Sequence, residues 1–144
     1  GGVGSLGFAC LFNIRGKRLA VATFGGLLSW FLFVIFSYFI KNEPVNYFIV
    51  SLLISLFAEV MARVMKTPTT TFLVPSIVPL IPGSALYYTM NYALNEQWSQ
   101  FAAQAFYTLQ LALSLAVGII AVTTAVRLIT AFTAKHHPQP IKTK

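Results

Sequence analysis

Long apolar segments alternate with short polar connections along the whole sequence. The apolar segments cover about residues 1–13, 19–40, 45–65, 72–92 and 99–131. A helix needs about 20 apolar residues to cross the hydrocarbon core of a bilayer. The second, third and fifth segments meet this length, and the fourth meets it but contains three prolines. We interpret the short first segment as the end of a helix whose beginning is missing, with a half-helix or re-entrant start as the alternative.

Composition supports the same class of protein. Hydrophobic residues make up 57% of the chain and charged residues 9%, and the three acidic residues are all glutamates, whereas soluble domains carry about 25% charged residues. We therefore predict an all-α polytopic membrane protein with about five transmembrane helices, the fourth broken by prolines. The membrane domain is expected at residues 1–131, and residues 132–144 are expected to form a disordered, basic cytoplasmic tail. The fifth segment exceeds the length of a crossing and should tilt or project from the membrane.

The basic residues predict the orientation of the chain. Nine of the ten lysines and arginines follow the first, third and fifth apolar segments, and Lys41 alone lies in a connection on the other side. Cytoplasmic loops carry an excess of basic residues. The bias therefore predicts an N-terminus outside and a C-terminus in the cytoplasm, as expected of five crossings in a bacterial inner membrane.

The fourth segment carries the candidate functional site. Pro75, Pro79, Pro82 and Gly83 fall within nine residues, and each proline removes a backbone donor and clashes with the carbonyl four residues back. Broken backbone is tolerated at membrane depth only where it is buried in protein or lines a watery cavity, and broken segments indicate transport sites. We predict a discontinuous, pathway-forming segment, with a merely kinked spanning helix as the alternative. The candidate pathway residues are Thr71, Pro75, Ser76, Pro79, Pro82, Gly83, Ser84 and Tyr87.

Charged residues inside a membrane are energetically costly, so those that are present usually have a function. Glu59 and Arg63 stand one helical turn apart near the end of the third segment. They are predicted either to couple protons or solute to transport, or only to stabilise the helix as an i,i+4 pair. The threonines at 67 and 69–71 supply hydroxyls just before the broken segment. Gln104, Gln110, Thr123 and Thr124 are expected to join helices rather than bind a ligand.

Small residues recur at the spacing that lets helices approach closely. The pairs Ala22 and Gly26, Gly25 and Ser29, and Ser114 and Gly118 are each four residues apart. Such pairs predict close helix–helix contacts within the membrane.

Several function classes are excluded or disfavoured by the sequence. With one cysteine, no aspartate and histidines only at 136 and 137, the chain offers no constellation for catalysis or metal binding. Its basic residues lie at the ends of apolar runs rather than in one patch, so nucleic-acid binding is not indicated. No cofactor or nucleotide motif is present. The Gly-Gly start without methionine suggests a truncated or processed N-terminus, and no signal peptide is evident.

Four stretches of the sequence resemble the threonine/serine exporter (ThrE) family, in the form that corresponds to its C-terminal half. The opening Gly7-Phe8-Ala9 through Phe12-Asn13-Ile14 is similar to the first motif of that family. Gly25-Gly26, and Ala58-Glu59 together with Arg63, continue the match. The strongest similarity is the tract Lys66-Thr67-Pro68-Thr69-Thr70-Thr71-Phe72-Leu73-Val74-Pro75-Ser76-Ile77-Val78-Pro79-Leu80-Ile81-Pro82-Gly83. Ser76 and Ser84 stand where glycine is common in the family.

The resemblance implies the small subunit of a secondary exporter of small polar metabolites. Fused members of the family carry two five-helix halves, so a free-standing second half implies a partner membrane subunit that resembles the first half. Fused members are linked to threonine and serine, whereas split pairs are linked to succinate and related dicarboxylates. Alternating access around the broken segment, driven by an ion or proton gradient, is the expected mechanism. The competing hypothesis is a homo-oligomeric channel or a structural assembly subunit.

Overall fold

The computed structural model describes residue 7 and residues 16–135. The regular elements in these residues are all helical: α2 (Lys17–Phe39), α3 (Glu43–Val64), α4 (Thr70–Ile77), the 3₁₀ helix η1 (Val78–Leu80), α5 (Gly83–Leu94) and α6 (Trp98–Lys135). Helices α2, α3 and α6 are long and apolar enough to cross a membrane, and the pair α4–α5 forms a fourth candidate crossing. The predicted all-α polytopic membrane class is therefore confirmed. The number of crossings and the orientation stay predictions.

Two predicted segments fall wholly or largely outside the described residues. The expected first segment, 1–13, is described only at residue 7, and the tail beyond residue 135 is not described. Helix α6 continues to Lys135, four residues past the expected end of the membrane domain.

Helices α2, α3 and α4 pack into a bundle through small side chains. Helix α2 buries Ala22, Gly25, Gly26 and Ser29, the four residues of its two predicted small-residue pairs. A Cβ added at Gly25 would lie 2.1 Å from the Ser76 Oγ of α4, so glycine is what allows this approach. The predicted close packing along α2 is confirmed.

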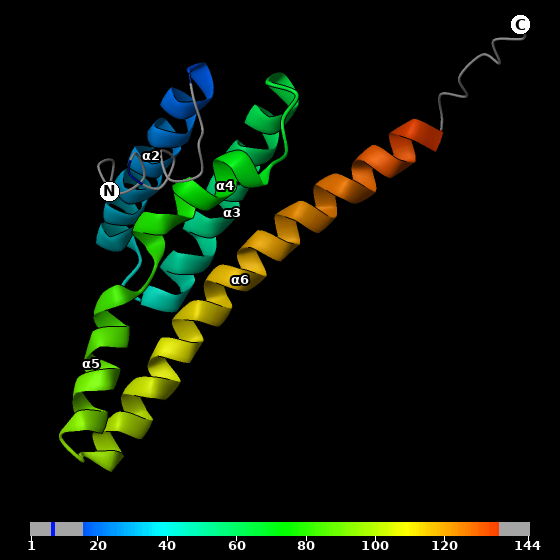
Figure 1. The fold of residues 1–144 in the computed structure, drawn as a ribbon. Coiled ribbons are helices and arrows are strands. Elements are labelled where there is room, and N and C mark those ends of the chain that lie inside the picture. Colours follow the sequence, from blue (N-terminus) through cyan, green and yellow to red (C-terminus); the bar gives the residue numbers. More distant parts are fainter. Residues whose placement is uncertain (1–6, 8–15, 136–144) are drawn as a thin grey trace, which may run out of the picture.

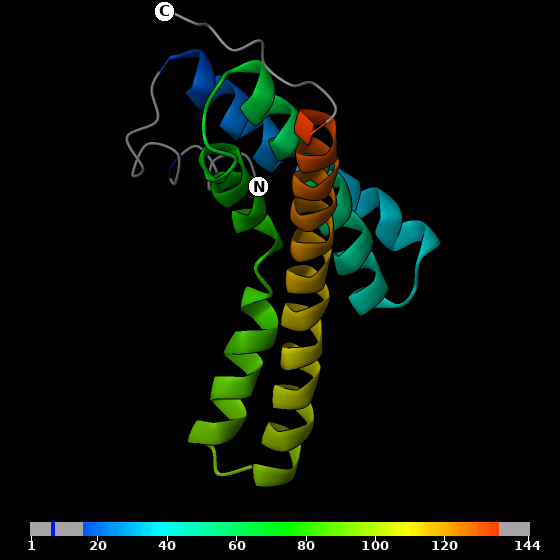
Figure 2. The ribbon, with the colours of Figure 1, turned by 90° about the vertical axis from the view of Figure 1, so that its right-hand side faces the viewer.

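A second close contact joins α3 to α6. A Cβ added at Gly118 would lie 1.8 Å from the Ser51 Oγ and 3.0 Å from the Phe48 carbonyl oxygen. Because any side chain larger than hydrogen would collide there, Gly118 sets the separation of the two helices where they cross (Figures 1 and 2). The prediction that Gly118 lies in a helix contact is also confirmed.

The fourth segment breaks at its third proline. Pro75 is accommodated inside α4, and Pro79 lies in η1. Ile81 is extended, as expected of a residue before proline, and Pro82 has φ −74° and ψ 61°. With the Gly83 N–H donating to the Ile81 carbonyl at 2.7 Å, Pro82 forms an inverse γ-turn. The two halves of the segment meet at 55°.

Helices α5 and α6 form a hairpin; α5 and the first part of α6 extend away from the bundle, whereas the rest of α6 packs along α3 (Figures 1 and 2). Of the twelve residues of α5, only Ala85 is buried. The hydroxyls of Thr89 and Thr108 lie 3.0 Å apart and link the two helices. The 38 residues of α6 span about 57 Å at 1.5 Å per residue, well beyond a hydrocarbon core of about 30 Å. Its length matches the prediction that the last apolar segment exceeds a single crossing.

Candidate functional site

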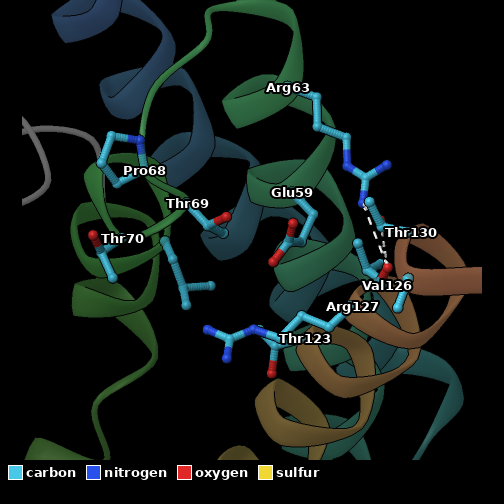
Figure 3. A pocket seen from close by; sticks show the side chains of 11 residues that line it. Glu59, Arg63, Pro68, Thr69, Thr70, Thr123, Val126, Arg127 and Thr130 are labelled. Carbon is cyan, nitrogen blue, oxygen red and sulfur yellow. Dashed lines mark hydrogen bonds between the residues drawn. The ribbon is translucent and has the colours of Figure 1, made fainter. Parts of the chain in front are cut away.

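A polar pocket of about 620 Å³ lies where the ends of α3 and α6 meet the start of α4. Its volume falls within the usual range for ligand pockets, about 300–1,000 Å³. Figure 3 shows the carboxylate, guanidinium and hydroxyl groups around it. The lining residues are Glu59, Arg63, Pro68, Thr69, Thr70, Leu73, Thr123, Val126, Arg127, Thr130 and Ala131.

A tight turn after α3 brings the threonine tract back to this pocket. Lys66 has φ 50°, and the Thr67 N–H donates to the Ala62 carbonyl at 3.0 Å. This 6→1 hydrogen bond across a left-handed residue is the Schellman end of a helix. Pro68 follows and its carbonyl accepts from the Thr71 N–H at 3.1 Å, which starts the next helical turn. Thr69 and Thr70 are thereby held beside the end of α3.

Arg63 bonds across the pocket rim to α6. Its Nη2 donates to the Thr130 Oγ1 at 2.6 Å and to the Val126 carbonyl oxygen at 3.5 Å. The Thr130 hydroxyl in turn donates to the same Val126 carbonyl at 2.8 Å. Among the described residues, Arg63 has no ion pair with Glu59. Arg63 therefore bonds to α6 and does not form the i,i+4 pair with Glu59 that was considered from the sequence.

Glu59 and Arg127 face the same space from different helices. In Figure 3 the Glu59 carboxylate points into the pocket from α3, and the Arg127 side chain extends from α6 across it toward α4. Within residues 16–135, neither side chain has a hydrogen bond or an ion pair. A carboxylate and a guanidinium that line one cavity without pairing leave their charges available to a solute with the opposite charges.

The residues expected to form the pathway are spread over three environments. Pro75, Ser76 and Pro82 are buried, Thr71 and Pro79 are half-buried, and Gly83, Ser84 and Tyr87 are exposed. The Ser76 hydroxyl contacts the position of Gly25 rather than a cavity, and it is buried without a hydrogen-bond partner in the described part of the chain. Of the predicted site residues, only Glu59 and Arg63 line the pocket.

Sequence reasoning missed the contribution of α6 to this pocket. Thr123, Arg127 and Thr130 lie four and three residues apart and line the pocket together. This spacing places them on one face of a helix. An arginine with threonines on the same helix face, near the end of an apolar helix, is the signal that could have identified the site. Thr123 was instead expected to join helices.

The fold and this pocket together define a multi-pass membrane protein with a polar, charged cavity at the end of two spanning helices. The family model of the threonine/serine exporter, ThrE, matches residues 2–125. The chain therefore belongs to the threonine/serine exporter (ThrE) family, which is a family of membrane transporters rather than of enzymes. Neither the curated proteins nor the solved structures gave a match in the same comparisons.

Proposed function

We propose that this chain is the small subunit of a secondary exporter in a bacterial inner membrane, and that its solute binds in the pocket between α3, α4 and α6. The proposal depends mainly on the observation that Glu59 and Arg127 line the same cavity and form no ion pair with each other. Ionisable residues within membrane segments generally mark substrate or proton pathways. Family membership supports export as the direction of transport.

The groups in the pocket suit a small molecule with an ammonium and a carboxylate. A guanidinium binds a carboxylate with two parallel hydrogen bonds, which fixes orientation as well as position. The Glu59 carboxylate accepts hydrogen bonds from the ammonium group, and the hydroxyls of Thr69 and Thr70 line the same pocket, where they can bond to a polar side chain of the solute. A hydroxyl-bearing amino acid such as threonine or serine fits this set.

Succinate-type dicarboxylates are the alternative solute class. Two arginines and one glutamate give the pocket a formal excess of one positive charge, which favours an anion. However, the Arg63 guanidinium is already bonded to Thr130 and Val126. An ionised Glu59 would also repel the second carboxylate. The amino acid is therefore the solute that we favour.

A partner subunit would complete the pathway along the broken segment. Ser84, Tyr87, Tyr88 and Asn91 are exposed on α5 and recur at intervals of three and four residues, which places them on one face. Lipid cannot satisfy hydrogen-bonding groups, so these side chains call for a protein neighbour. We propose that a membrane subunit resembling the other half of the family, or a second copy, covers this face. Ser84 and Tyr87 would then line the pathway as the sequence predicts.

Transport by membrane vesicles tests the solute and the pocket together. Vesicles from cells that express the chain with its partner subunit should show saturable, exchangeable flux of radiolabelled L-threonine and weaker flux of succinate. Glu59→Gln and Arg127→Gln should reduce threonine flux at unchanged membrane abundance. The matched controls are Glu96→Gln and Arg18→Gln, which lie outside the pocket. Flux that does not saturate or exchange would favour the channel hypothesis instead.

The oligomeric state of the chain can be measured separately from transport. The mass of the complex in nanodiscs should correspond to a hetero-oligomer, or at least to more than one copy of the chain. A monodisperse monomer that transports threonine alone would contradict the proposed partner.

A further inference from the structure

A second polar pocket lies at the other end of the contact between α3 and α6. It has a volume of about 580 Å³ and is lined by Lys41, Asn42, Glu43, Pro44, Tyr107 and Gln110. Lys41 and Asn42 belong to the connection between α2 and α3, Glu43 and Pro44 begin α3, and Tyr107 and Gln110 come from α6. The same two helices therefore carry a polar pocket at each end of their contact.

The side chains of this second pocket repeat the chemistry of the first. The Tyr107 hydroxyl donates a hydrogen bond to the Glu43 carboxylate, which fixes the carboxylate against α6. Lys41 lines the same cavity, and no ion pair joins it to Glu43 in the described part of the chain. One cation and one carboxylate thus share a cavity without neutralising each other, as Arg127 and Glu59 do at the other end.

The two pockets lie on opposite sides of a closed midpoint. Glu43 and Glu59 are 16 residues apart on α3, or about 24 Å at 1.5 Å per residue, which approaches the thickness of the hydrocarbon core. Ser51 lies midway between them along the helix, where it meets Gly118 in the tight contact described above. The helix crossing therefore lies between the two pockets along α3 and α6.

An apolar recess extends from the second pocket toward this crossing. It measures about 350 Å³ and shares Pro44 and Gln110 with the polar pocket. Its other lining residues include Phe48 and Ser114. The Phe48 carbonyl also lies 3.0 Å from a Cβ placed at Gly118, so the recess reaches the residues of the crossing itself. The second pocket and the apolar recess thus lie next to each other between α3 and α6, on the same side of the crossing.

We propose that the pocket formed by Lys41, Glu43, Tyr107 and Gln110 is a second solute site, at which the exported molecule binds on the far side of the α3–α6 crossing before release. The inference rests on the proposed function, because it takes the same class of solute, a small molecule with one ammonium and one carboxylate. Lys41 binds the carboxylate and Glu43 binds the ammonium. Tyr107 is a positioning residue that holds Glu43, and the Gln110 amide bonds to the remaining polar groups. Under the predicted orientation, this site faces outward and the Glu59 pocket faces the cytoplasm.

Sided transport kinetics test the second site. Right-side-out and inside-out vesicles, from cells that express the chain with its partner subunit, give separate half-saturation concentrations for L-threonine at each face. Glu43→Gln and Lys41→Gln should raise the outward-face value roughly tenfold, as expected for the loss of a charge-assisted hydrogen bond. The inward-face value should stay unchanged, and Glu59→Gln should show the converse. Glu96→Gln is the matched control, since Glu96 is an exposed glutamate outside both pockets.

The Tyr107→Phe variant keeps the test independent of the charged substitutions. It removes only the hydroxyl that holds Glu43, so it should raise the outward-face value by a smaller factor and leave the maximal rate unchanged. Equal outward-face values for Glu43→Gln, Tyr107→Phe and Glu96→Gln, with threonine flux intact, would overturn the second site alone. Absence of saturable threonine flux in the unmodified chain would overturn the proposed function, and this inference with it.

Discussion

The bundle of α2, α3 and α4 and the hairpin of α5 and α6 are packed in different ways. In the bundle, α3 buries seven of its 22 residues, and the buried Asn46 amide donates to the Phe33 carbonyl of α2 at 3.2 Å. In the hairpin, α5 buries Ala85 alone. Large side chains such as Met90 and Phe106 are 65% and 71% exposed. The bundle is stabilised by its own contacts, whereas most of the surface of α5 and of the start of α6 has no protein neighbour among the described residues.

The difference follows from what drives helix association in a bilayer. Exposed apolar side chains lose nothing in lipid, so helices associate through close backbone approach and interhelical hydrogen bonds. The bundle has glycine and alanine at its contacts, and these permit that approach. The projecting part of the hairpin carries large apolar residues. There, a hydrogen bond between the Thr89 and Thr108 hydroxyls links α5 to α6. We infer that contacts within the chain fix α2, α3, α4 and the part of α6 that crosses α3. The orientation of α5 and of the start of α6 depends on the break at Pro82 and on neighbours in the membrane.

The largest expected effect comes from removing the break between these regions. Replacing Pro75, Pro79 and Pro82 together by alanine should favour a continuous helix, because alanine is about 3 kcal/mol more favourable than proline at each interior position. The 55° bend would then be lost, and threonine export should fail although the chain still folds. Vesicle flux at matched membrane abundance measures this. Single cysteines at the exposed positions Ser84 and Tyr87 in a Cys10→Ala background should react with water-soluble thiol reagents if they line the pathway, whereas a cysteine at the buried Ser76 should not.

Substitution of two phenylalanines tests how tightly the two regions are packed. Phe72 is fully buried in the bundle, and Phe106 is 71% exposed on α6. Phe72→Ala should lower the free energy of unfolding by about 3 kcal/mol, the low end for buried phenylalanines. Phe106→Ala should change it by less than about 0.5 kcal/mol, as exposed substitutions usually do. Thermal unfolding in detergent measures both. Equal losses would show that the hairpin is as tightly packed as the bundle.

A pair of glycines tests the close contacts directly. Gly25→Ala should destabilise the chain by about 1–2 kcal/mol, because its Cβ would meet Ser76 and Phe57 in the bundle. Gly83→Ala, at the start of α5, meets nothing within 4 Å and should be neutral or slightly stabilising. Ser76→Ala removes a buried hydroxyl without a partner, so it should be nearly neutral alone and should restore part of the loss in Gly25→Ala. A Gly25→Ala variant as stable as Gly83→Ala would show that this contact is loose.

The sequence predicts the class of fold and its packing residues well because both depend on local patterns. Runs of about 20 apolar residues identify spanning helices. The spacing of Gly25, Ser29 and Gly118 identifies faces that approach closely. The proline tract likewise indicates a broken segment. It does not indicate that Pro75 is accommodated in a helix and that the bend occurs at Pro82, because the outcome depends on how each freed carbonyl is satisfied by packing.

The pocket could be predicted only in part, because its members come from three separate stretches of sequence. Glu59 and Arg63 are conspicuous as charges in an apolar segment, and both line the pocket. Arg127 resembles an ordinary basic residue at the end of a helix until the crossing of α3 and α6 brings it beside Glu59. The bonding of Arg63 to Thr130, 67 positions away, likewise depends on tertiary packing.

The smallest expected effect concerns the hydrogen bond that joins the two helices of the hairpin. Thr89→Val removes the hydroxyl that lies 3.0 Å from the Thr108 Oγ1 and keeps the shape of the side chain. Interhelical hydrogen bonds in membrane proteins contribute about 0.6 kcal/mol on average, so the free energy of unfolding should fall by about that amount. Thr124→Val, at an exposed threonine of α6, is the matched control and should have no effect. In a double-mutant cycle, Thr108→Val should add little once Thr89 is changed, because both remove the same bond. Additive losses would mean that the two hydroxyls act separately, and that some other contact holds α5 against α6.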